Sequence, residues 1–257
     1  MRTDEIEGTR GYEEFVSAVA GEMGLGDAVH HPGTSVIPAD DRSGSAMVVA
    51  YSISEHTVLW CDPALADDLF ELADPLRATS QTEFISWAER VGWGEVSVDH
   101  MQLLRAAGVV RPDVSTSAWT RSLDRECAED VALIDAFKAL LSDADRDEAD
   151  LDEDRLDEHM LAIVDDHGIA AFASQQPFAL ADTFGDIAVA TRPDARGSGL
   201  GKLAVAALCD EIGSRSMWPL YRCDTANLGS VRLSASLGFV PVVRILACKR
   251  REVCSMK

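Results

Sequence analysis

The sequence predicts an α/β protein whose sheet contains parallel strands, and three observations support this fold class. In the second half of the chain, short apolar strands alternate with helical stretches, which is typical of sheets with parallel segments. A glycine-rich stretch at residues 196–201 stands directly between a predicted strand and a predicted helix. The chain has 257 residues and is 47% hydrophobic, enough to bury one large core or two ordinary ones.

The first half is expected to form a small α/β lobe. In chain order we expect a helix at 12–24, a loop rich in Gly, Pro and Asp, strands at 46–53 and 56–61, helices at 63–73 and 82–93, and a strand at 95–104. Pro63 favours the first turn of its helix, and Gly92 is the expected stop of the next one. Residues 110–122 lack periodicity, which predicts a boundary between domains at 1–115 and 122–257.

The second half is expected to carry the larger mixed sheet, flanked by helices. In chain order we expect a helix at 128–142, an acidic solvated segment at 143–159, strands at 159–166, 168–175 and 185–191, a helix at 199–213, a strand at 219–224, a helix at 230–237 and a strand at 241–249. Phe137 and Leu141 belong to the apolar stripe of the first of these helices.

The formal net charge of −21 excludes nucleic acid as a general partner, because binding to the phosphate backbone depends on Lys and Arg contacts. The chain has no apolar stretch near the roughly 20 residues that span a bilayer, and its acidic start is unlike a secretory signal. We therefore expect a cytoplasmic protein with no membrane partner, and a homodimer is left open. Four lysines against nineteen arginines indicate a GC-rich bacterial genome.

The cysteines are expected to be reduced thiols without a metal. The six are Cys61, Cys127, Cys209, Cys223, Cys248 and Cys254. They form no CxxC pair and no matched histidine spacing, so neither a zinc site nor a disulfide framework is predicted.

Residues 192–202 predict an anion site, because Arg192, Arg196 and Lys202 surround three glycines in an acidic protein. Glycines let the backbone approach phosphate oxygens closely, and the free N–H groups of the following helix point at the same place. A dinucleotide fingerprint would need glycine at Lys202, and a nucleotide-triphosphate loop would need Ser or Thr at Leu203. Neither nucleotide motif is present.

Arg196-x-x-Gly199-x-Gly201 between a strand and a helix resembles the acyl-CoA diphosphate loop of the GNAT (GCN5-related N-acetyltransferase) family. The stretch from Asn227 to the Leu237-Gly238-Phe239 ending resembles the next family signature, an Asn-led turn that enters a helix. The resemblance covers roughly residues 125–250 and implies a GNAT-type fold there. The helix ending at Val91-Gly92-Trp93 echoes the second signature, so the first half is expected to be a degenerate GNAT-like lobe without a cofactor site.

The resemblance implies acetyl-CoA as co-substrate and assigns its binding residues. The strand end at Val189, Ala190 and Thr191 would bind the pantetheine arm and the acyl carbonyl. The loop residues Arg196, Gly197, Ser198, Gly199, Leu200, Gly201 and Lys202 would hold the diphosphate. Asn227 and Ser230 would lie near the thioester.

The candidate catalytic residues are Asp186 and Ser234. Asp186 stands near the usual position of the family's base, although a solvated strand-edge aspartate is an equal alternative. Ser234 occupies the place where many relatives carry a tyrosine acid, and it is a weak acid. Tyr221 is the nearest tyrosine in the sequence. The predicted function is acetyl transfer to a primary amine of a small molecule or a protein, and the alternative is an acyl-CoA sensor without catalysis.

Overall fold

The computed structural model describes residues 11–40, 43, 45, 47–74, 77–94, 96–105, 108–113, 117–151, 159–178 and 180–249. The helices in these residues are α2 (Tyr12–Glu22), α3 (Ala66–Phe70), α4 (Gln81–Arg90), α5 (Ala128–Lys138), α6 (Asp143–Glu148), α7 (Leu200–Ser214) and α8 (Leu228–Leu237), with short 3₁₀ turns at η1 (Gly26–His30), η3 (Pro63–Leu65) and η4 (Pro193–Ala195). The strands are β1 (Gly33–Pro38), β2 (Met47–Ile53), β3 (His56–Cys61), β4 (Val96–Leu104), β5 (Trp119–Leu123), β6 (His159–Asp165), β7 (Gly168–Pro177), β8 (Phe184–Thr191), β9 (Trp218–Asp224) and β10 (Phe239–Lys249).

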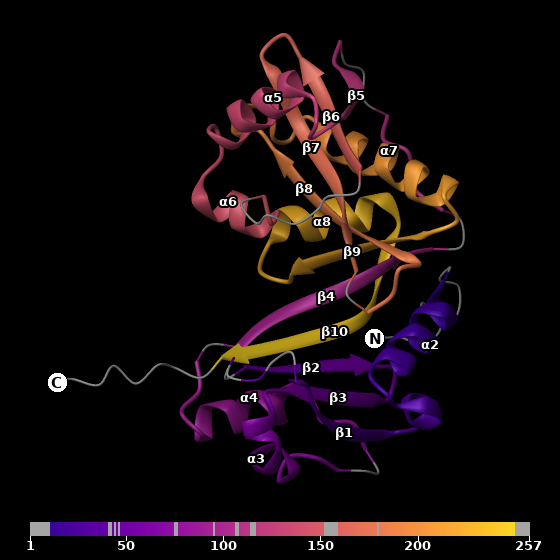
Figure 1. Ribbon diagram of the computed structural model, residues 1–257, viewed down its shortest axis with the longest axis vertical. Coiled ribbons are helices and arrows are strands. Elements are labelled where there is room, and N and C mark those ends of the chain that lie inside the picture. Colours follow the sequence, from indigo (N-terminus) through magenta and orange to yellow (C-terminus); the bar gives the residue numbers. More distant parts are fainter. Residues whose placement is uncertain are drawn as a thin grey trace, which may run out of the picture.

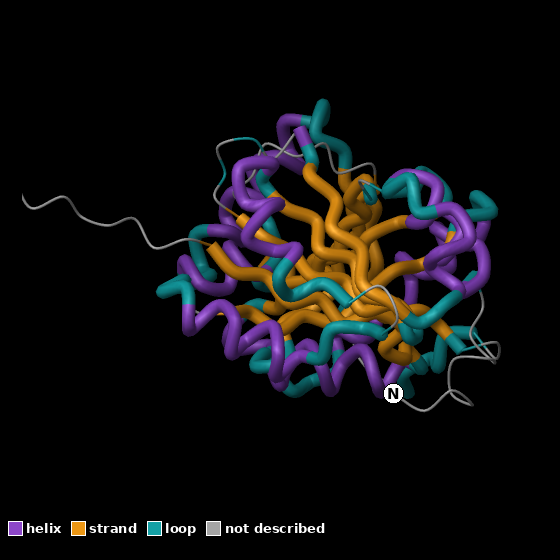
Figure 2. Tube along the Cα trace, turned by 90° about the horizontal axis from the view of Figure 1, so that it is seen from below, coloured by secondary structure: helices purple, strands orange, loops and turns teal. Residues whose placement is uncertain are grey.

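All of these strands join one mixed sheet, in the order β1-β3-β2-β10-β4-β9-β8-β7-β6-β5 (Figure 1). β1 runs parallel to β3 and β8 runs parallel to β9, whereas the other neighbours are antiparallel. Helices surround the strands on both sides of the sheet (Figure 2). The α/β class with parallel segments is confirmed. None of the described helices is long and apolar enough to cross a membrane.

The strands of the two halves interleave at the centre of the sheet. β10, the last described strand, lies between β2 and β4, and β4 in turn pairs with β9 of the second half. Each of these two strands follows a helix that ends near a glycine of positive φ, Gly92 at 72° and Gly238 at 96°. The sheet is therefore continuous, and the division at 1–115 and 122–257 stays a prediction.

Helix α7 holds the glycine-rich loop against the sheet. Its buried residues include Leu200, Val205, Leu208 and Ile212, and they pack in one core cluster with Ile163 and Ala171 of the sheet. Burying each large aliphatic side chain stabilises the fold by roughly 1.5–3 kcal/mol. The N-terminus of α7 is therefore rigidly placed at the end of β8.

Two strands were not expected from the sequence. β1 lies in the stretch expected to be a loop, and β5 begins inside the aperiodic stretch at 110–122. Both are edge strands, and edge strands are commonly short and polar because one side of their backbone meets solvent. The sequence GTSVIP starts with glycine and ends with proline, and WTRSL has one buried residue, Leu123. Neither gives a clear alternating signal.

Candidate functional site

A cavity of about 770 Å³ opens where β8, the glycine-rich loop, α6 and α8 meet. Eleven of the twelve residues predicted to bind the cofactor line it: Val189, Ala190, Thr191, Arg196, Gly197, Gly199, Leu200, Gly201, Lys202, Asn227 and Ser230. The twelfth, Ser198, lines a neighbouring cavity of about 260 Å³. The fold thus brings the predicted residues together from three separate stretches of chain.

The loop has the backbone shape that an anion site needs. Gly197 and Gly199 have φ values of 78° and 86°, a left-handed conformation that other residues rarely adopt. Gly199 is the N-cap residue of α7 and supplies no side-chain cap, so the first N–H groups of the helix are left for a ligand. A Cβ on Gly201 would lie 2.7 Å from Thr191 Oγ1, which shows how closely the first turn of α7 approaches β8.

β8 and β9 pair only along part of their length. Their register runs from Phe184 opposite Trp218 to Ile187 opposite Tyr221, and no pairing follows it among the described residues. On its other side β8 stays paired with β7 as far as Thr191. The main-chain groups of β8 that face β9 beyond Ile187 are therefore available to a ligand that lies between the strands, and the cavity is lined by Val189, Ala190 and Thr191 at this point.

Among the three basic residues of the loop, Arg192 has a structural role. Its side chain is buried and binds Asp165 (Nη2 to Oδ2, 2.8 Å) and Asp194 (Nε to Oδ1, 2.6 Å). These contacts raise the pKa of Arg192 and lower the pKa of both carboxyl groups. Arg192 therefore fixes the turn after β8, and Arg196 and Lys202 are the loop cations that reach the cavity.

The short helix α6 covers the cavity with two acidic residues. Asp145 pairs with Arg196 at 2.7 Å, and Asn227 Nδ2 donates to Glu148 Oε1 at 2.8 Å. Bonds from Ser142 and the charge of Arg196 hold the pKa of Asp145 below its ordinary value. The acidic segment expected to be a solvated face thus contacts two of the predicted binding residues. The part at 152–158 lies outside the described residues.

Asn227 and Ser230 form the N-terminal cap of α8. Asn227 Oδ1 accepts from the backbone N–H of Ser230 at 3.1 Å, as an N-cap residue does. Both line the cavity. The Asn-led turn is therefore structural as well as placed for a ligand.

The two candidate catalytic residues lie outside the cavity wall. Asp186 is buried on β8, and its Oδ2 lies 3.0 Å from Arg222 Nη2 on β9. Ser234 is fully buried in α8, and its hydroxyl donates to the carbonyl of Val231 at 3.1 Å. Neither lines either of the two cavities. Their catalytic roles stay predictions.

Tyr221 lies at the point where β8 and β9 separate. It is the last residue of β9 paired with β8, it is 1% exposed, and its ring packs on Phe239 with centroids 5.4 Å apart. Burial raises the pKa of its phenol, and the side chain of Ser230 lowers it. The hydroxyl has no hydrogen bond of standard geometry within the described structure. A buried phenol hydroxyl thus lies beside Ser230, a residue of the cavity wall.

A group of carboxylates surrounds Arg222 near the same point. Burial and then the charge of Asp224, its direct cross-strand partner, raise the pKa of Asp99. The charges of Asp186 and Asp150 raise the pKa of Arg222. Sequence reasoning missed Asp99 and Glu148. The one sequence signal for Asp99 is that a charged residue interrupts the otherwise strand-like pattern EVSVDHM.

The site fits a phosphate-bearing ligand better than a metal. Among the described residues, no group of three or more His, Cys, Asp and Glu side chains could hold a metal ion. Of the six cysteines, the five in the described part are free thiols, and Cys254 lies outside it. Loop amides, Arg196 and Lys202 provide the donors that a diphosphate requires.

Comparison with known families supports the resemblance found in the sequence. Residues 161–245 match the family model described as GNAT acetyltransferase, a stretch that runs from β6 into β10. The match confirms the GNAT resemblance for residues 161–245, which include β8, the glycine-rich loop and α8. It also supports acetyl transfer as the general activity.

One solved structure shares the fold over nearly the whole chain, and others are less similar. A GCN5-related N-acetyltransferase-like protein from Streptococcus suis is 19% identical with a TM-score of 0.50, and the match covers 94% of this chain and 100% of that one. A GCN5-related N-acetyltransferase from Kribbella flavida is 18% identical with a TM-score of 0.49, covering 65% of this chain and 63% of that one. A GNAT-family acetyltransferase from Colwellia psychrerythraea is 11% identical with a TM-score of 0.46, covering 67% and 63%. This chain thus spans less than two thirds of the last two structures. No curated protein matches the sequence.

Proposed function

We propose that the protein transfers an acetyl group from acetyl-CoA to a primary amine of a small molecule or a protein. One observation carries the proposal. A glycine-rich loop at the N-terminus of α7 and the unpaired end of β8 that precedes this loop line the same cavity. A ligand with a diphosphate and an amide-bearing arm matches both features at once.

The residues of the cavity would divide the work of binding. The loop amides around Gly197 and Gly199, with Arg196 and Lys202, would hold the diphosphate. The free edge of β8 at Val189–Thr191 would hydrogen-bond the pantetheine amides and the acyl carbonyl. The helix N-terminus adds roughly 0.3–1 kcal/mol for an exposed anion.

The carboxylates around Arg222 would attract the protonated amine and prepare it for reaction. The amine must lose a proton before its nitrogen bonds to the acetyl carbon and the carbon–sulfur bond breaks. Asp186 is the predicted acceptor of that proton, and Asp99 is a second candidate because its raised pKa makes it a better base. The departing thiolate needs a proton donor, and Tyr221 is a candidate because it lies where β8 and β9 separate and interacts with Ser230 of the cavity wall.

Two measurements test the proposal. Calorimetry with coenzyme A should show saturable binding, and a thiol-release assay with acetyl-CoA and a panel of amines should show turnover. A cytoplasmic bacterial enzyme with an acidic surface should prefer polyamines and lysine-bearing peptides over neutral amines. Absence of any heat with coenzyme A would overturn the proposal.

An acyl-CoA sensor without catalysis is the second candidate function. It is favoured by Ser234, whose hydroxyl is turned to Val231, and by Asp186, whose carboxylate is held by Arg222. Tight binding of acetyl-CoA without turnover for any amine would support the sensor. If turnover occurs, Asp186→Asn should reduce it across the pH range, whereas the exposed control Asp182→Asn should not. Full activity of Asp186→Asn would remove Asp186 from the mechanism.

A further inference from the structure

Two carboxylates of the short helix α6 line the larger cavity, and they contact different parts of its wall. Asp145 pairs with Arg196 of the glycine-rich loop at 2.7 Å, beside the expected diphosphate. Glu148 lies about one turn further along α6 and contacts Asn227 at the start of α8. Among the described residues that line this cavity, only these two carry a carboxylate. Glu148 is therefore the carboxylate of the wall that is not bound to the loop.

The side chain of Asn227 fixes the position of the Glu148 carboxylate. Asn227 Oδ1 accepts from Ser230 N and caps α8, and this leaves its amide nitrogen to donate to Glu148 Oε1 at 2.8 Å. The second carboxylate oxygen of Glu148, Oε2, makes no hydrogen bond or ion pair to the residues that the structure describes. A carboxylate that is oriented through one oxygen and keeps the other for a ligand suits the transfer of a proton.

The charge of Glu148 reaches the point where β8 and β9 separate. Burial is the main cause of the raised pKa values of Asp99, Tyr221 and Cys223, and the charge of Glu148 adds to each of them. The free end of β8, expected to bind the acyl carbonyl, begins just beyond the residue that pairs with Tyr221. Within the described residues, the charged and titratable side chains that share the cavity with Glu148 or interact with its charge are Asp145 of α6, Arg196 and Lys202 of the loop, Arg232 of α8, Asp99 of β4, and Tyr221 and Cys223 of β9. Glu148 thus faces the place where the acetyl group is expected.

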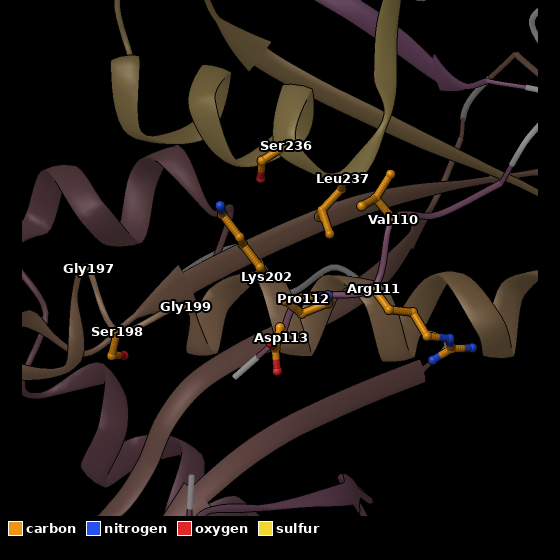
Figure 3. Close-up of a pocket in the computed structure, with 10 residues that line it drawn as sticks. All are labelled: Val110, Arg111, Pro112, Asp113, Gly197, Ser198, Gly199, Lys202, Ser236 and Leu237. Atoms are coloured by element: carbon orange, nitrogen blue, oxygen red, sulfur yellow. The ribbon is translucent and has the colours of Figure 1, made fainter. Parts of the chain in front are cut away.

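The other carboxylates near the site are less well placed to meet an amine. Asp186 is buried, its Oδ2 lies 3.0 Å from Arg222 Nη2, and it lines neither cavity. Asp99 lines neither cavity as well. Asp113 lines the smaller cavity of about 260 Å³ (Figure 3), but residues 189–191 of the strand end do not line that cavity. Only Glu148 combines a place in the cavity wall with a position near the end of β8.

We propose that Glu148 is the catalytic residue that takes the proton from the protonated amine, with Asn227 as its positioning residue. Glu148 then acts in place of Asp186, the acceptor predicted from the sequence. Asp186 and Asp99 contribute negative charge that attracts the amine but do not receive its proton. This inference rests on the proposed function, because it takes acetyl transfer to an amine as the reaction.

The proton transfer leaves a nucleophile on the substrate and a neutral acid on α6. Glu148 Oε2 takes one proton from the ammonium group, and the nitrogen lone pair bonds to the acetyl carbon. The carbon–sulfur bond breaks with its electron pair on sulfur, and one further proton passes from the nitrogen to the sulfur. The products are the N-acetylated amine and the free thiol of coenzyme A. Because Glu148 is exposed, it returns its proton to water before the next turnover.

The test removes the proton acceptor and keeps its shape. Glu148→Gln retains an oxygen for the bond from Asn227 but cannot take a proton. With spermidine and a lysine-bearing peptide as acceptors, kcat at pH 7 should fall about 100-fold or more, while the Kd for coenzyme A changes less than two-fold. The loss should shrink about tenfold per pH unit toward alkaline pH, because more of the amine has then lost its proton to solvent.

The matched control for this variant is Asp147→Asn. Asp147 is exposed on the same helix and lines neither cavity. Its substitution removes the same negative charge and should leave kcat, the Kd for coenzyme A and the pH profile unchanged.

Asn227→Ser tests the positioning of the carboxylate. Serine also caps a helix start, so α8 should stay folded, but it lacks the amide N–H that reaches Glu148. We expect kcat to fall about 5–20-fold, with the same recovery at alkaline pH. The double variant should lose little more than Glu148→Gln alone, because Asn227 acts through Glu148.

The outcomes separate this inference from the proposed function. Wild-type kcat in Glu148→Gln, or a loss that does not shrink at alkaline pH, overturns the role of Glu148 and leaves the proposed function standing. Alkaline recovery in Asp186→Asn but not in Glu148→Gln overturns it too and returns the role to Asp186. Absence of turnover by the wild-type protein with every amine of the panel overturns both.

Discussion

β3 and β8 each lead the chain into the start of a helix, and the two turns use that helix start differently. After β3, Pro63 has no N–H to leave free, and the Asp62 carboxylate accepts from Ala64 N at 3.1 Å. After β8, the turn has glycines and no side-chain cap, and its free N–H groups face a cavity of about 770 Å³. In the first half the Asp62 carboxylate thus occupies the helix start, whereas in the second half the N–H groups of α7 stay open to an anion from outside.

This difference explains why the helix start after β8, and not the one after β3, leaves N–H groups open to an anion. A helix start capped by its own carboxylate already holds a negative charge beside its N–H groups, which disfavours a phosphate there. The 3₁₀ turn η3 and the five-residue α3 also present little dipole compared with the fifteen residues of α7. The first half reaches the second half instead through strand β4, which pairs with β9 and β10.

The largest effect should follow from placing a carboxylate in the open turn. Gly197→Glu puts a negative charge where the diphosphate is expected, and two charges about 4 Å apart repel by roughly 4 kcal/mol at the effective dielectric near a protein surface. Calorimetry should therefore show affinity for coenzyme A at least about 100-fold weaker. Gly92→Glu is the matched control, because Gly92 has a similar φ of 72° and open space around it.

Both glutamate variants force a side chain into the left-handed region, at a cost of about 1–2 kcal/mol of folding free energy. They should therefore lose similar stability in urea unfolding while only Gly197→Glu loses the cofactor. Unchanged affinity in Gly197→Glu would mean that the turn after β8 is not the diphosphate site.

Tyr221→Phe should have the next largest effect, and on catalysis rather than binding. If the buried hydroxyl donates to the departing sulfur, kcat should fall about 10–100-fold while the Kd for coenzyme A changes less than two-fold. Stability should change by less than about 1 kcal/mol, because the hydroxyl makes no hydrogen bond of standard geometry and interacts with the side chain of Ser230. A purely structural role would instead lower stability and leave kcat intact.

Tyr12→Phe provides the comparison in the first half. The hydroxyl of Tyr12 interacts with Ser54, and burial raises its pKa, so its removal costs a hydrogen bond without touching the cavity. Stability should fall by about 1 kcal/mol and kcat should not change. Equal losses of kcat in both tyrosine variants would argue against a catalytic Tyr221.

Asp145→Asn should have a smaller effect of opposite sign on binding. The carboxylate of Asp145 holds Arg196 at 2.7 Å, and the pair is partly exposed, so it contributes only about 0.2–1 kcal/mol. Freeing Arg196 for the diphosphate should tighten coenzyme A binding about 2–5-fold at low salt, and less at high salt. Asparagine keeps an oxygen for the bonds from Ser142.

The control for this variant is Asp143→Asn in the same helix. The Asp143 side chain is 99% exposed and pairs with Arg146 rather than with the loop. Asp143→Asn removes the same negative charge as Asp145→Asn and should leave the affinity for coenzyme A unchanged. Weaker binding in Asp145→Asn would show that Asp145 positions Arg196 for the ligand rather than competing with it.

The open turn could be predicted from sequence, because its determinants lie within about ten residues of one another. The glycines, the strand before them and the apolar stripe of α7 are all local signals. The N-cap role of Asn227 is local too, and both predicted features line one cavity.

The residues beyond the turn could not be predicted, because their neighbours depend on long-range pairing. Asp99 meets Asp224, and residues 110–113 meet α8, only because β4 inserts between β9 and β10. The sequence of β4 fits a strand but does not specify its partners. The polar edge strands β1 and β5 were missed for a related reason, since half of their backbone faces solvent and no alternation is required of them.

Asp99→Asn tests this inserted strand and should give the smallest effect. The pKa of Asp99 is raised by burial and by Asp224, so ionised Asp99 opposes folding, and this cost appears as pH rises through its folded pKa. The variant should match wild type below about pH 4 and gain roughly 0.5–1 kcal/mol at pH 7–8 in urea unfolding. Asp224→Asn should give a similar gain in the free energy of unfolding. The double variant should gain less than the sum of the two single variants, because each single variant already removes the repulsion between Asp99 and Asp224. A loss of stability at pH 7 would instead show that the attraction between Asp99 and Arg222 outweighs the repulsion between Asp99 and Asp224. In that case β4 contributes a carboxylate to an ion-pair network around Arg222.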